Sequence, residues 1–227
     1  MNKLNHVAFI MDGNGRWGKK RKKGRNHGHL NGVKTVSNIV QSSIKFNIPI
    51  ITFYVFSTEN WKRPKKEIKF LFNLIKTYFK KEIDNIIKND IKINIIGKMT
   101  NLPSNVKIVL NETIKKTNKN KKILVNIALN YGSKSELVDS IKKIELKSNV
   151  TINSISKNLY TKGLPDPDIL IRTGGQKRLS NFMLWQLAYS ELFFTDTLWP
   201  DFNESIFINA LYFYQTRKRR FGLLRDI

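Results

Sequence analysis

The chain has no cysteine among its 227 residues. It therefore forms no disulfide, carries no thiol nucleophile and offers no thiolate metal site, which fits a reducing cytoplasm. It also has no stretch rich in proline, glycine and serine that could act as a linker. We therefore expect residues 1–227 to form a single domain with one full core.

Long hydrophobic runs are absent as well. The longest apolar stretch, Ile48 to Phe56, is far too short to span a bilayer. The N-terminal apolar run, Val7 to Met11, is too short for a signal peptide. These absences predict a soluble, cytoplasmic protein.

Acidic residues are missing from the whole segment between Gly13 and Thr58. The segment opens with Gly13 and Gly15, directly after an apolar run and a single acid, Asp12. Its basic residues are Arg16, Lys19, Lys20, Arg21, Lys22, Lys23, Arg25, Lys34 and Lys45. Glycines let backbone N–H groups approach a phosphate closely. One carboxylate facing a basic glycine-bearing loop predicts a diphosphate ligand, with Mg²⁺ shared between Asp12 and phosphate oxygens.

The glycines also match a different signature. Gly13-x-Gly15-x-x-Gly18 spells the dinucleotide-binding fingerprint and follows a predicted strand. However, no acid lies about twenty residues downstream, and Lys19 to Arg25 is a charge run where that fingerprint requires an apolar helix. Asn14-Gly15 alone would be typical of a hairpin turn. Asp12 and the basic tract favour a phosphate site over both alternatives.

The net charge of +24 and the isoelectric point near 10.2 are compatible with nucleic acid or anionic membrane as partners. Lysine outnumbers arginine 31 to 10 and is spread through segments rich in asparagine and isoleucine, which indicates mostly solvated surface. Arginine is the more informative residue because its planar group binds phosphate through two donors. The arginines in predicted loops or strand ends are Arg16, Arg25, Arg63, Arg172 and Arg178.

Strand-like runs alternate with helical periodicity along the chain. The expected strands are Val7–Met11, Ile50–Phe56, Ile91–Ile96, Ile123–Asn130, Ile169–Thr173 and Leu192–Thr195. The expected helices are Leu30–Lys45, Glu67–Ile87, Ser104–Lys116, Ser135–Ile144, Ser154–Tyr160 and Glu204–Arg217. This alternation predicts an α/β fold with a central, mostly parallel six-stranded sheet covered by helices. Ligands bind such sheets at the carboxyl ends of the strands.

Two further polar loops follow predicted strands. The segment from Phe56 to Pro64 mixes hydroxyl, amide, indole and guanidinium groups, although it also fits an ordinary loop leading into a helix. In the segment from Asp166 to Phe182, Arg172, Arg178 and Ser180 flank a Gly-Gly turn, which suits a second phosphate group. Both loops and Asp12 can converge on one crevice.

These segments together resemble the cis-prenyltransferases, in particular the bacterial undecaprenyl diphosphate synthases. The matching motifs occur in family order over nearly the whole chain: His6 to Trp17, Gly28-His29-x-x-Gly32, Phe56 to Trp61 with Arg63, Asn130 to Gly132, Ile171 to Gly175, Arg178-x-Ser-Asn-Phe182, Trp185 to Glu191, and Trp199 to Phe202. The chain departs from many bacterial members at Gln176 and Lys177, where glutamate and histidine are common.

The resemblance implies a dimeric α/β enzyme that uses Mg²⁺ to condense isopentenyl diphosphate repeatedly onto farnesyl diphosphate, forming cis double bonds. The product would be a long-chain polyprenyl diphosphate, undecaprenyl diphosphate in bacteria, which is the precursor of the lipid carrier for cell-wall polysaccharide. The implied partners are the two diphosphates and a second copy of the chain. The basic surface would allow the protein to contact lipid peripherally at the inner face of the membrane. No nucleic-acid partner is expected.

The resemblance also implies roles for individual residues. Asp12 and Asn60 would be catalytic, and Asp12 and Glu191 would contact Mg²⁺, Glu191 either directly or through a ligand. The allylic diphosphate would be cradled by Gly13, Asn14, Gly15 and Arg16 with Arg25, while His29 and Asn60 would lie beside that site and Arg63 would assist the leaving diphosphate. Further residues expected to bind substrate are Trp17, Ser57, Glu59 and Trp61. Isopentenyl diphosphate would lie against Arg172, Arg178 and Ser180, with Arg220 and Gly222 of an Arg-x-Gly element reaching across the dimer.

Three hypotheses follow for the function. We favour an active cis-prenyltransferase over a noncatalytic subunit of the same fold, because a silent subunit has no use for the metal acid Asp12. A basic nucleic-acid-binding protein is the third reading, and it predicts salt-sensitive affinity for nucleic acid. An apolar stripe on the helix after Arg63 is typical of plain core packing, but it could also line a cavity for a polyprenyl tail. The stripe comprises Ile68, Leu71, Phe72, Ile75, Phe79, Ile83 and Ile86.

Overall fold

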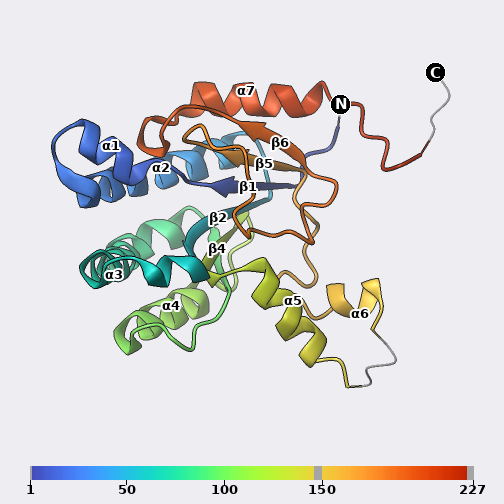
Figure 1. Ribbon diagram of the computed structural model, residues 1–227, viewed down its shortest axis with the longest axis horizontal. Helices are drawn as coiled ribbons and strands as arrows, with labels where there is room; N and C mark the ends of the chain where they lie inside the picture. Colours follow the sequence, from blue (N-terminus) through green and yellow to red (C-terminus); the bar gives the residue numbers. More distant parts are fainter. Residues whose placement is uncertain (1, 146–149, 224–227) are drawn as a thin grey trace.

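A six-stranded parallel sheet forms the centre of the computed structural model, which describes residues 2–145 and 150–223 (Figure 1). The strands are β1 (His6–Ile10), β2 (Ile50–Ser57), β3 (Ile91–Ile96), β4 (Ile123–Tyr131), β5 (Ile169–Arg172) and β6 (Glu191–Phe194). Their order is β3-β4-β2-β1-β5-β6, and every neighbouring pair is parallel. All six predicted strands are confirmed to within one residue at each end. The sheet is wholly parallel, whereas we expected a mostly parallel one.

Helices cover both faces of this sheet. They are α1 (Asn14–Lys20), α2 (Gly24–Lys45), α3 (Lys65–Lys88), α4 (Ser104–Thr117), α5 (Ser133–Lys142), α6 (Ile152–Ser156) and α7 (Glu204–Gln215), with short 3-10 turns η1 (Thr58–Lys62) and η3 (Trp199–Asp201). The larger core cluster joins apolar residues of α2, α3, α4 and α7 to one face, around stacked rings of Phe9 and Phe53. Parallel strands are buried on both faces, which explains their continuous apolar sequence.

The opposite face carries a smaller core. Ala8, Ile10 and Leu170 pack there against Phe182 and other apolar residues of the segment that follows β5. Figure 1 shows α5 and α6 together on the side away from α1 and α2. In the described part of the chain, no helix is long and apolar enough to cross a membrane.

The largest error in our prediction concerns residues 14–29. We expected a loop after Asp12 and a first helix starting at Leu30, but Asn14–Lys20 is helix α1 and α2 begins at Gly24. Glycines, which have no side chain, permit the close packing of α1 against α2. A Cβ at Gly18 would lie 2.0 Å from the carbonyl oxygen of Gly24, and a Cβ at Gly28 would lie 1.8 Å from that of Asn14. The two helix backbones therefore touch only because glycines stand at the contact.

Smaller corrections concern the later helices. Helix α6 starts at Ile152, two residues before the predicted start, because Thr151 caps it by accepting a hydrogen bond from the backbone N–H of Ser154 at 3.1 Å. Helix α5 starts at Ser133, directly after Gly132. Helix α7 ends at Gln215, two residues before the predicted end.

Candidate active site

The carboxyl ends of β1, β2 and β5 border one cleft of about 620 Å³. Open parallel sheets bind ligands at this edge. The lining combines polar groups of three loops with a few apolar side chains: Ile10, Met11, Asp12, Asn14, His29, Tyr54, Val55, Ser57, Glu59, Asn60, Arg63, Leu71, Arg172, Arg178, Ser180 and Asn181. The three loops that we expected to converge do meet here.

Asp12 lies between two guanidinium groups. Its Oδ2 accepts a hydrogen bond from Nη2 of Arg172 at 3.0 Å, and its Oδ1 accepts one from Nη2 of Arg16 at 3.1 Å. The backbone carbonyl of Asp12 accepts hydrogen bonds from the N–H of Trp199 at 3.0 Å and from the hydroxyl of Thr173 at 2.7 Å. These bonds hold the turn after β1, so the carboxylate keeps its place at the cleft while 30% of it stays exposed.

Arg172 organises the loop after β5. Its side chain is only 4% exposed, and its Nη1 donates to the Ser180 hydroxyl at 2.7 Å and to the carbonyl of Arg178. Ser180 and Asn181 have φ values of 51° and 62°, a left-handed backbone that is unfavourable for residues other than glycine. The predicted group of Arg172, Arg178 and Ser180 is thus brought together by a loop that wraps around the buried guanidinium.

Asn181 connects this loop to two other elements. Its Nδ2 donates to Oε1 of Glu59 at 2.8 Å, and its Oδ1 accepts from the backbone N–H of Lys134 at 2.9 Å. Its carbonyl accepts from the N–H of Ser133 at 2.8 Å. Burial acts to raise the pKa of the Glu59 carboxyl, but its hydrogen bonds, led by that from Asn181, lower the pKa below its usual value. Asn181 was not among the residues that we predicted from sequence.

The loop after β2 contributes the next group of polar side chains. Ser57, Glu59 and Asn60 all line the cleft. The Oδ1 of Asn60 accepts a hydrogen bond from the backbone N–H of Ser57 at 3.2 Å, which closes the 3-10 turn η1. The predicted residues of this loop therefore line the same cleft as Asp12, with the exception of Trp61.

A carboxylate that we did not predict lies among the basic groups on the other side of the cleft. Oε2 of Glu67 accepts from Nε of Arg25 at 3.0 Å, and Oε1 accepts from Nη2 of Arg25 at 3.0 Å and from Nη1 of Arg63 at 3.2 Å. His29 Nε2 lies 3.6 Å from the same Oε1. Our interpretation of Asp12 as the only carboxylate of the phosphate-binding tract is wrong, because Glu67 folds back onto that tract.

The pKa values of Glu67 and His29 determine the charge of this cluster. Burial raises the pKa of the Glu67 carboxyl, but the hydrogen bonds and positive charges of Arg25 and Arg63 outweigh burial, so its pKa lies below the usual value. Burial lowers the pKa of His29 to about 4, despite the opposing charge of Glu67. At neutral pH the cluster therefore contains two cations, one anion and a neutral imidazole.

The two predicted tryptophans have other partners. Nε1 of Trp17 donates to Oδ1 of Asp201 at 2.7 Å, and the ring stacks on His27. Nε1 of Trp61 donates to Oδ1 of Asn130 at 2.7 Å, and its ring packs against aromatic core residues. Neither indole belongs to the cleft lining. Gly13, whose φ of 115° suits glycine, and Gly15 lie between Asp12 and Arg16 in the turn that starts α1.

Three predicted residues lie at the amino ends of the strands, opposite the cleft. Glu191 begins β6 and pairs with Ile169 at the amino end of β5, whereas Asp12 follows the carboxyl end of β1. The residue before Arg220 bonds there too, since Arg219 donates to Oδ1 of Asp168 at 3.0 Å. The structure therefore does not bring Glu191, Arg220 or Gly222 to Asp12 within one chain.

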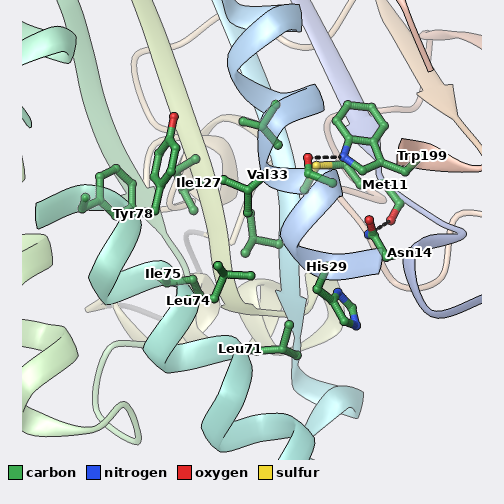
Figure 2. A pocket seen from close by; sticks show the side chains of 14 residues that line it. Met11, Asn14, His29, Val33, Leu71, Leu74, Ile75, Tyr78, Ile127 and Trp199 are labelled. Atoms are coloured by element: carbon green, nitrogen blue, oxygen red, sulfur yellow. Dashed lines mark hydrogen bonds between the residues drawn. The ribbon is translucent and has the colours of Figure 1, made fainter. Parts of the chain in front are cut away.

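An apolar passage continues from the cleft between α2 and α3. A first cavity of about 110 Å³ shares Met11, His29 and Leu71 with the cleft, and a second of about 50 Å³ follows it. Figure 2 shows Leu71, Leu74 and Ile75 of α3 on one side of the first cavity. Of the apolar stripe predicted on α3, Leu71, Ile75, Phe79 and Ile86 line the passage. Phe79 and Ile86 also belong to the core cluster, together with Ile68 and Phe72, and Ile83 lines neither cavity.

The cleft fits a metal ion held jointly with a ligand. Within residues 2–145 and 150–223, no group of three or more His, Cys, Asp or Glu side chains could hold a metal by itself. Asp12 presents a partly exposed carboxylate beside the arginines. Mg²⁺ usually binds one or two carboxylates together with substrate phosphates, so one acid is sufficient when a diphosphate supplies the other oxygens.

Comparisons with known proteins agree with this geometry. Residues 10–222 match the family described as putative undecaprenyl diphosphate synthase. The isoprenyl transferase of Prochlorococcus marinus subsp. pastoris is 47% identical over 230 residues, which cover 98% of this chain and 85% of that protein. The crystal structure of lavandulyl diphosphate synthase from Lavandula x intermedia, in complex with dimethylallyl diphosphate, superposes with a TM-score of 0.93 at 31% identity, covering 97% of this chain and 98% of that one. The crystal structure of a probable undecaprenyl diphosphate synthase from Campylobacter jejuni superposes with a TM-score of 0.84 at 33% identity, covering 98% of this chain and 100% of that one.

Proposed function

Because this chain belongs to the undecaprenyl diphosphate synthase family of cis-prenyltransferases, we propose that it condenses isopentenyl diphosphate repeatedly onto farnesyl diphosphate. The product is a long-chain polyprenyl diphosphate, with undecaprenyl diphosphate as the expected length. This product serves as the precursor of the lipid carrier for cell-wall polysaccharide. The proposed assembly is a homodimer in the cytoplasm, whose basic surface contacts anionic membrane lipid peripherally.

The observation that carries this proposal is the arrangement of two separate arginine groups around Asp12, beside the mouth of an apolar passage. Arg63 lines the cleft near the passage, and Arg25 binds the same Glu67 carboxylate just outside the lining. Arg172 and Arg178 line the cleft from the loop after β5. Two diphosphates can thus bind with one acid between them, and the tail of only one of them enters the passage. A reaction that lengthens a prenyl chain from its diphosphate end needs this arrangement.

Residue roles follow from the two sides of the cleft. Arg25, Arg63, Asn14 and His29 bind the allylic diphosphate, whose tail enters the passage past Leu71. The other substrate, isopentenyl diphosphate, is held by Arg172, Arg178 and Ser180. Asn60 and Ser57 line the cleft beside the reacting carbons. The proposed binding set is completed by Gly13, Gly15, Arg16, Trp17, Glu59 and Trp61. Trp17 and Trp61 act indirectly, by packing α1 and η1 in place.

The reaction forms a bond between C4 of isopentenyl diphosphate and C1 of the allylic chain. The bond from C1 to the diphosphate oxygen breaks, and a proton leaves C2 of the former isopentenyl unit. Mg²⁺ held by Asp12 and phosphate oxygens would neutralise charge on the departing diphosphate. Guanidinium groups stabilise the same charge, because they stand in place before it develops.

One incubation tests the function. Purified protein with labelled isopentenyl diphosphate, farnesyl diphosphate and Mg²⁺ should yield labelled polyprenyl diphosphates of defined length, sized by chromatography after removal of the diphosphate. Omitting farnesyl diphosphate or chelating the metal should abolish the product. A folded dimer that makes no product under these conditions would support a noncatalytic subunit instead.

A further inference from the structure

Glu67 places a negative charge where the proposed function calls for positive ones. It lies in the first turn of α3, and its side chain is only 10% exposed. Three hydrogen bonds reach it from Arg25 and Arg63, the two arginines assigned to the allylic diphosphate. A diphosphate that binds these two guanidinium groups must therefore share them with a buried carboxylate.

The geometry leaves donors free for a ligand. Arg25 uses Nε and Nη2 for Glu67, while its Nη1 lies over Gly15, 2.7 Å from the position that a Cβ would take there. Arg63 uses Nη1 for Glu67 and lines the cleft. Glu67 itself lies behind these groups and does not belong to the cleft lining. It thus holds both guanidinium groups from outside the cleft, while Arg63 faces the cleft and Arg25 lies against Gly15 of the turn that starts α1.

The charge of Glu67 is not cancelled by its remaining neighbour. His29 lies 3.6 Å away and is neutral at pH 7, because burial lowers its pKa to about 4. The cluster of Arg25, Arg63 and Glu67 carries a net charge of +1 where the two arginines alone would carry +2. A fixed negative charge a few ångströms behind the donors repels a bound polyanion.

We propose that Glu67 is a positioning residue that acts as a built-in counter-anion: it holds Arg25 and Arg63 in place and weakens their grip on inorganic diphosphate. This inference rests on the proposed function, in which every condensation leaves one diphosphate in this site. Affinity differences between related complexes lie mainly in the dissociation rate. Glu67 therefore accelerates the release of the leaving group between cycles.

Calorimetric titration with inorganic diphosphate alone, at low ionic strength and without substrates, tests the proposal. Glu67→Gln keeps the shape and an acceptor oxygen but removes the charge, so it should bind diphosphate about tenfold more tightly than the parent protein. Glu67→Asp keeps the charge and should not bind more tightly. The gain should shrink as salt is added, since salt screens charges. In turnover assays, Glu67→Gln should also be inhibited by diphosphate at a correspondingly lower concentration.

Asp84→Asn provides the matched control, because Asp84 is an exposed acid of the same helix. It removes one negative charge from α3 away from the cleft, and diphosphate affinity should stay within about twofold of the parent. Unchanged or weaker binding by folded Glu67→Gln would overturn the counter-anion role while leaving the proposed function standing. A parent protein that binds no diphosphate would reject the proposed function, and this inference with it.

Discussion

At the scale of single residues, Asp12 has to serve two purposes at once. It neutralises part of the charge of Arg16 and Arg172, which donate to its two oxygens. In the proposed function it is also the acid that would hold Mg²⁺ at the cleft. The two purposes are compatible, because each carboxylate oxygen has lone pairs left after one hydrogen bond. Arg172 is nearly buried, so removing its acidic partner leaves an uncompensated charge.

We expect Asp12→Ala to lower turnover by roughly 10²-fold or more, the scale seen when a key electrostatic group is removed from an active site. The rate of isopentenyl incorporation with saturating substrates and Mg²⁺ measures this effect. Circular dichroism and the gel-filtration elution volume, compared with those of the parent protein, check that the variant is folded. Near-normal turnover in a folded Asp12→Ala protein would reject a catalytic role for this carboxylate.

His6 shows how one buried residue can make the whole fold sensitive to pH. Its Nδ1 lies 2.8 Å from the carbonyl oxygen of Pro165, and its Nε2 lies 2.7 Å from the hydroxyl of Thr52. Asn126 and Asn94 extend this chain of hydrogen bonds across β4 and β3. The imidazole is fully buried, and burial lowers its pKa from 6.5 to about 4.

The free energy of unfolding should therefore fall as the pH drops from about 6.5 towards 4. In that window the unfolded chain binds a proton at His6 and the folded chain does not, so stability is lost as the pH decreases. The contribution of His6 is at most about 1.4 kcal/mol per pH unit. Urea unfolding between pH 7 and pH 5 should show a steeper loss for the parent protein than for His6→Gln. Equal slopes in the two proteins would contradict a neutral, buried His6.

Some site residues could be predicted from the sequence, and others could not. Asp12 follows the end of β1, and Arg172 ends β5 with Ser180 in the loop after it; a parallel sheet brings such ends together. Glu67 looked like a plain helix-start acid, because acids favour the first turn of a helix. Only the fold brings it to Arg25, 42 positions earlier in the chain. No local pattern encodes a pairing of that kind.

At the scale of elements, helices α2 and α3 decide how much room a prenyl tail has. The two cavities between them hold about 110 and 50 Å³ and share Val36, Tyr78, Phe79 and Ile127. The hydroxyls of Ser37 and Tyr78 lie 3.0 Å apart and join the two helices where the cavities meet. In the proposed function the growing tail enters this passage, so bulk added near its mouth would compete with the tail.

Leu71→Trp and Ile75→Trp should each shorten the product by one or more isoprene units, because both side chains line the first cavity (Figure 2). Product lengths measured by chromatography under identical substrate ratios test this. Ile87→Trp is the control, since Ile87 is on the same helix but 39% exposed to solvent. It should leave the product length unchanged. Parent-length products at wild-type rate from both passage variants would mean that the tail lies elsewhere.

The elements differ in how well their sequences specify them. The strands were predictable, because a buried parallel strand is a short apolar run with few alternatives. Helix α1 was not, since its residues carry no apolar periodicity, and its two glycines and three basic residues suggest a loop. It is held by contacts that a pattern cannot show, namely the glycine contacts with α2 and the bond from Trp17 to Asp201.

At the scale of the whole molecule, the roles proposed for Arg220 and Glu191 require a second copy of the chain. Both lie at the amino-terminal edge of the sheet, beside the last strand, β6. The cleft with Asp12 lies at the other edge, so neither residue serves it within its own chain. Exposed apolar side chains near β6 include Tyr189, Leu192 and Tyr212. A second copy packed along this side would cover them and could bring Arg220 to its neighbour's cleft.

A mixing experiment tests that proposed dimer. If Arg220 acts in the partner's site, Asp12→Ala and Arg220→Ala should each be weak alone but complement each other in mixed dimers. In a mixed dimer, one site has both groups intact and the other has lost both. Random two-fold pairing makes about half of the dimers mixed, so roughly a quarter of the wild-type activity should return.

Arg217→Ala is the control, because Arg217 is an arginine of the same tail outside the motif. The activity of Arg217→Ala alone should stay near wild type, and it is mixed with Asp12→Ala in the same way. If Arg220 serves its own chain instead, both sites of every mixed dimer stay damaged. Mixed dimers demonstrated with differently tagged chains, but without recovery of activity, would eliminate the cross-subunit role.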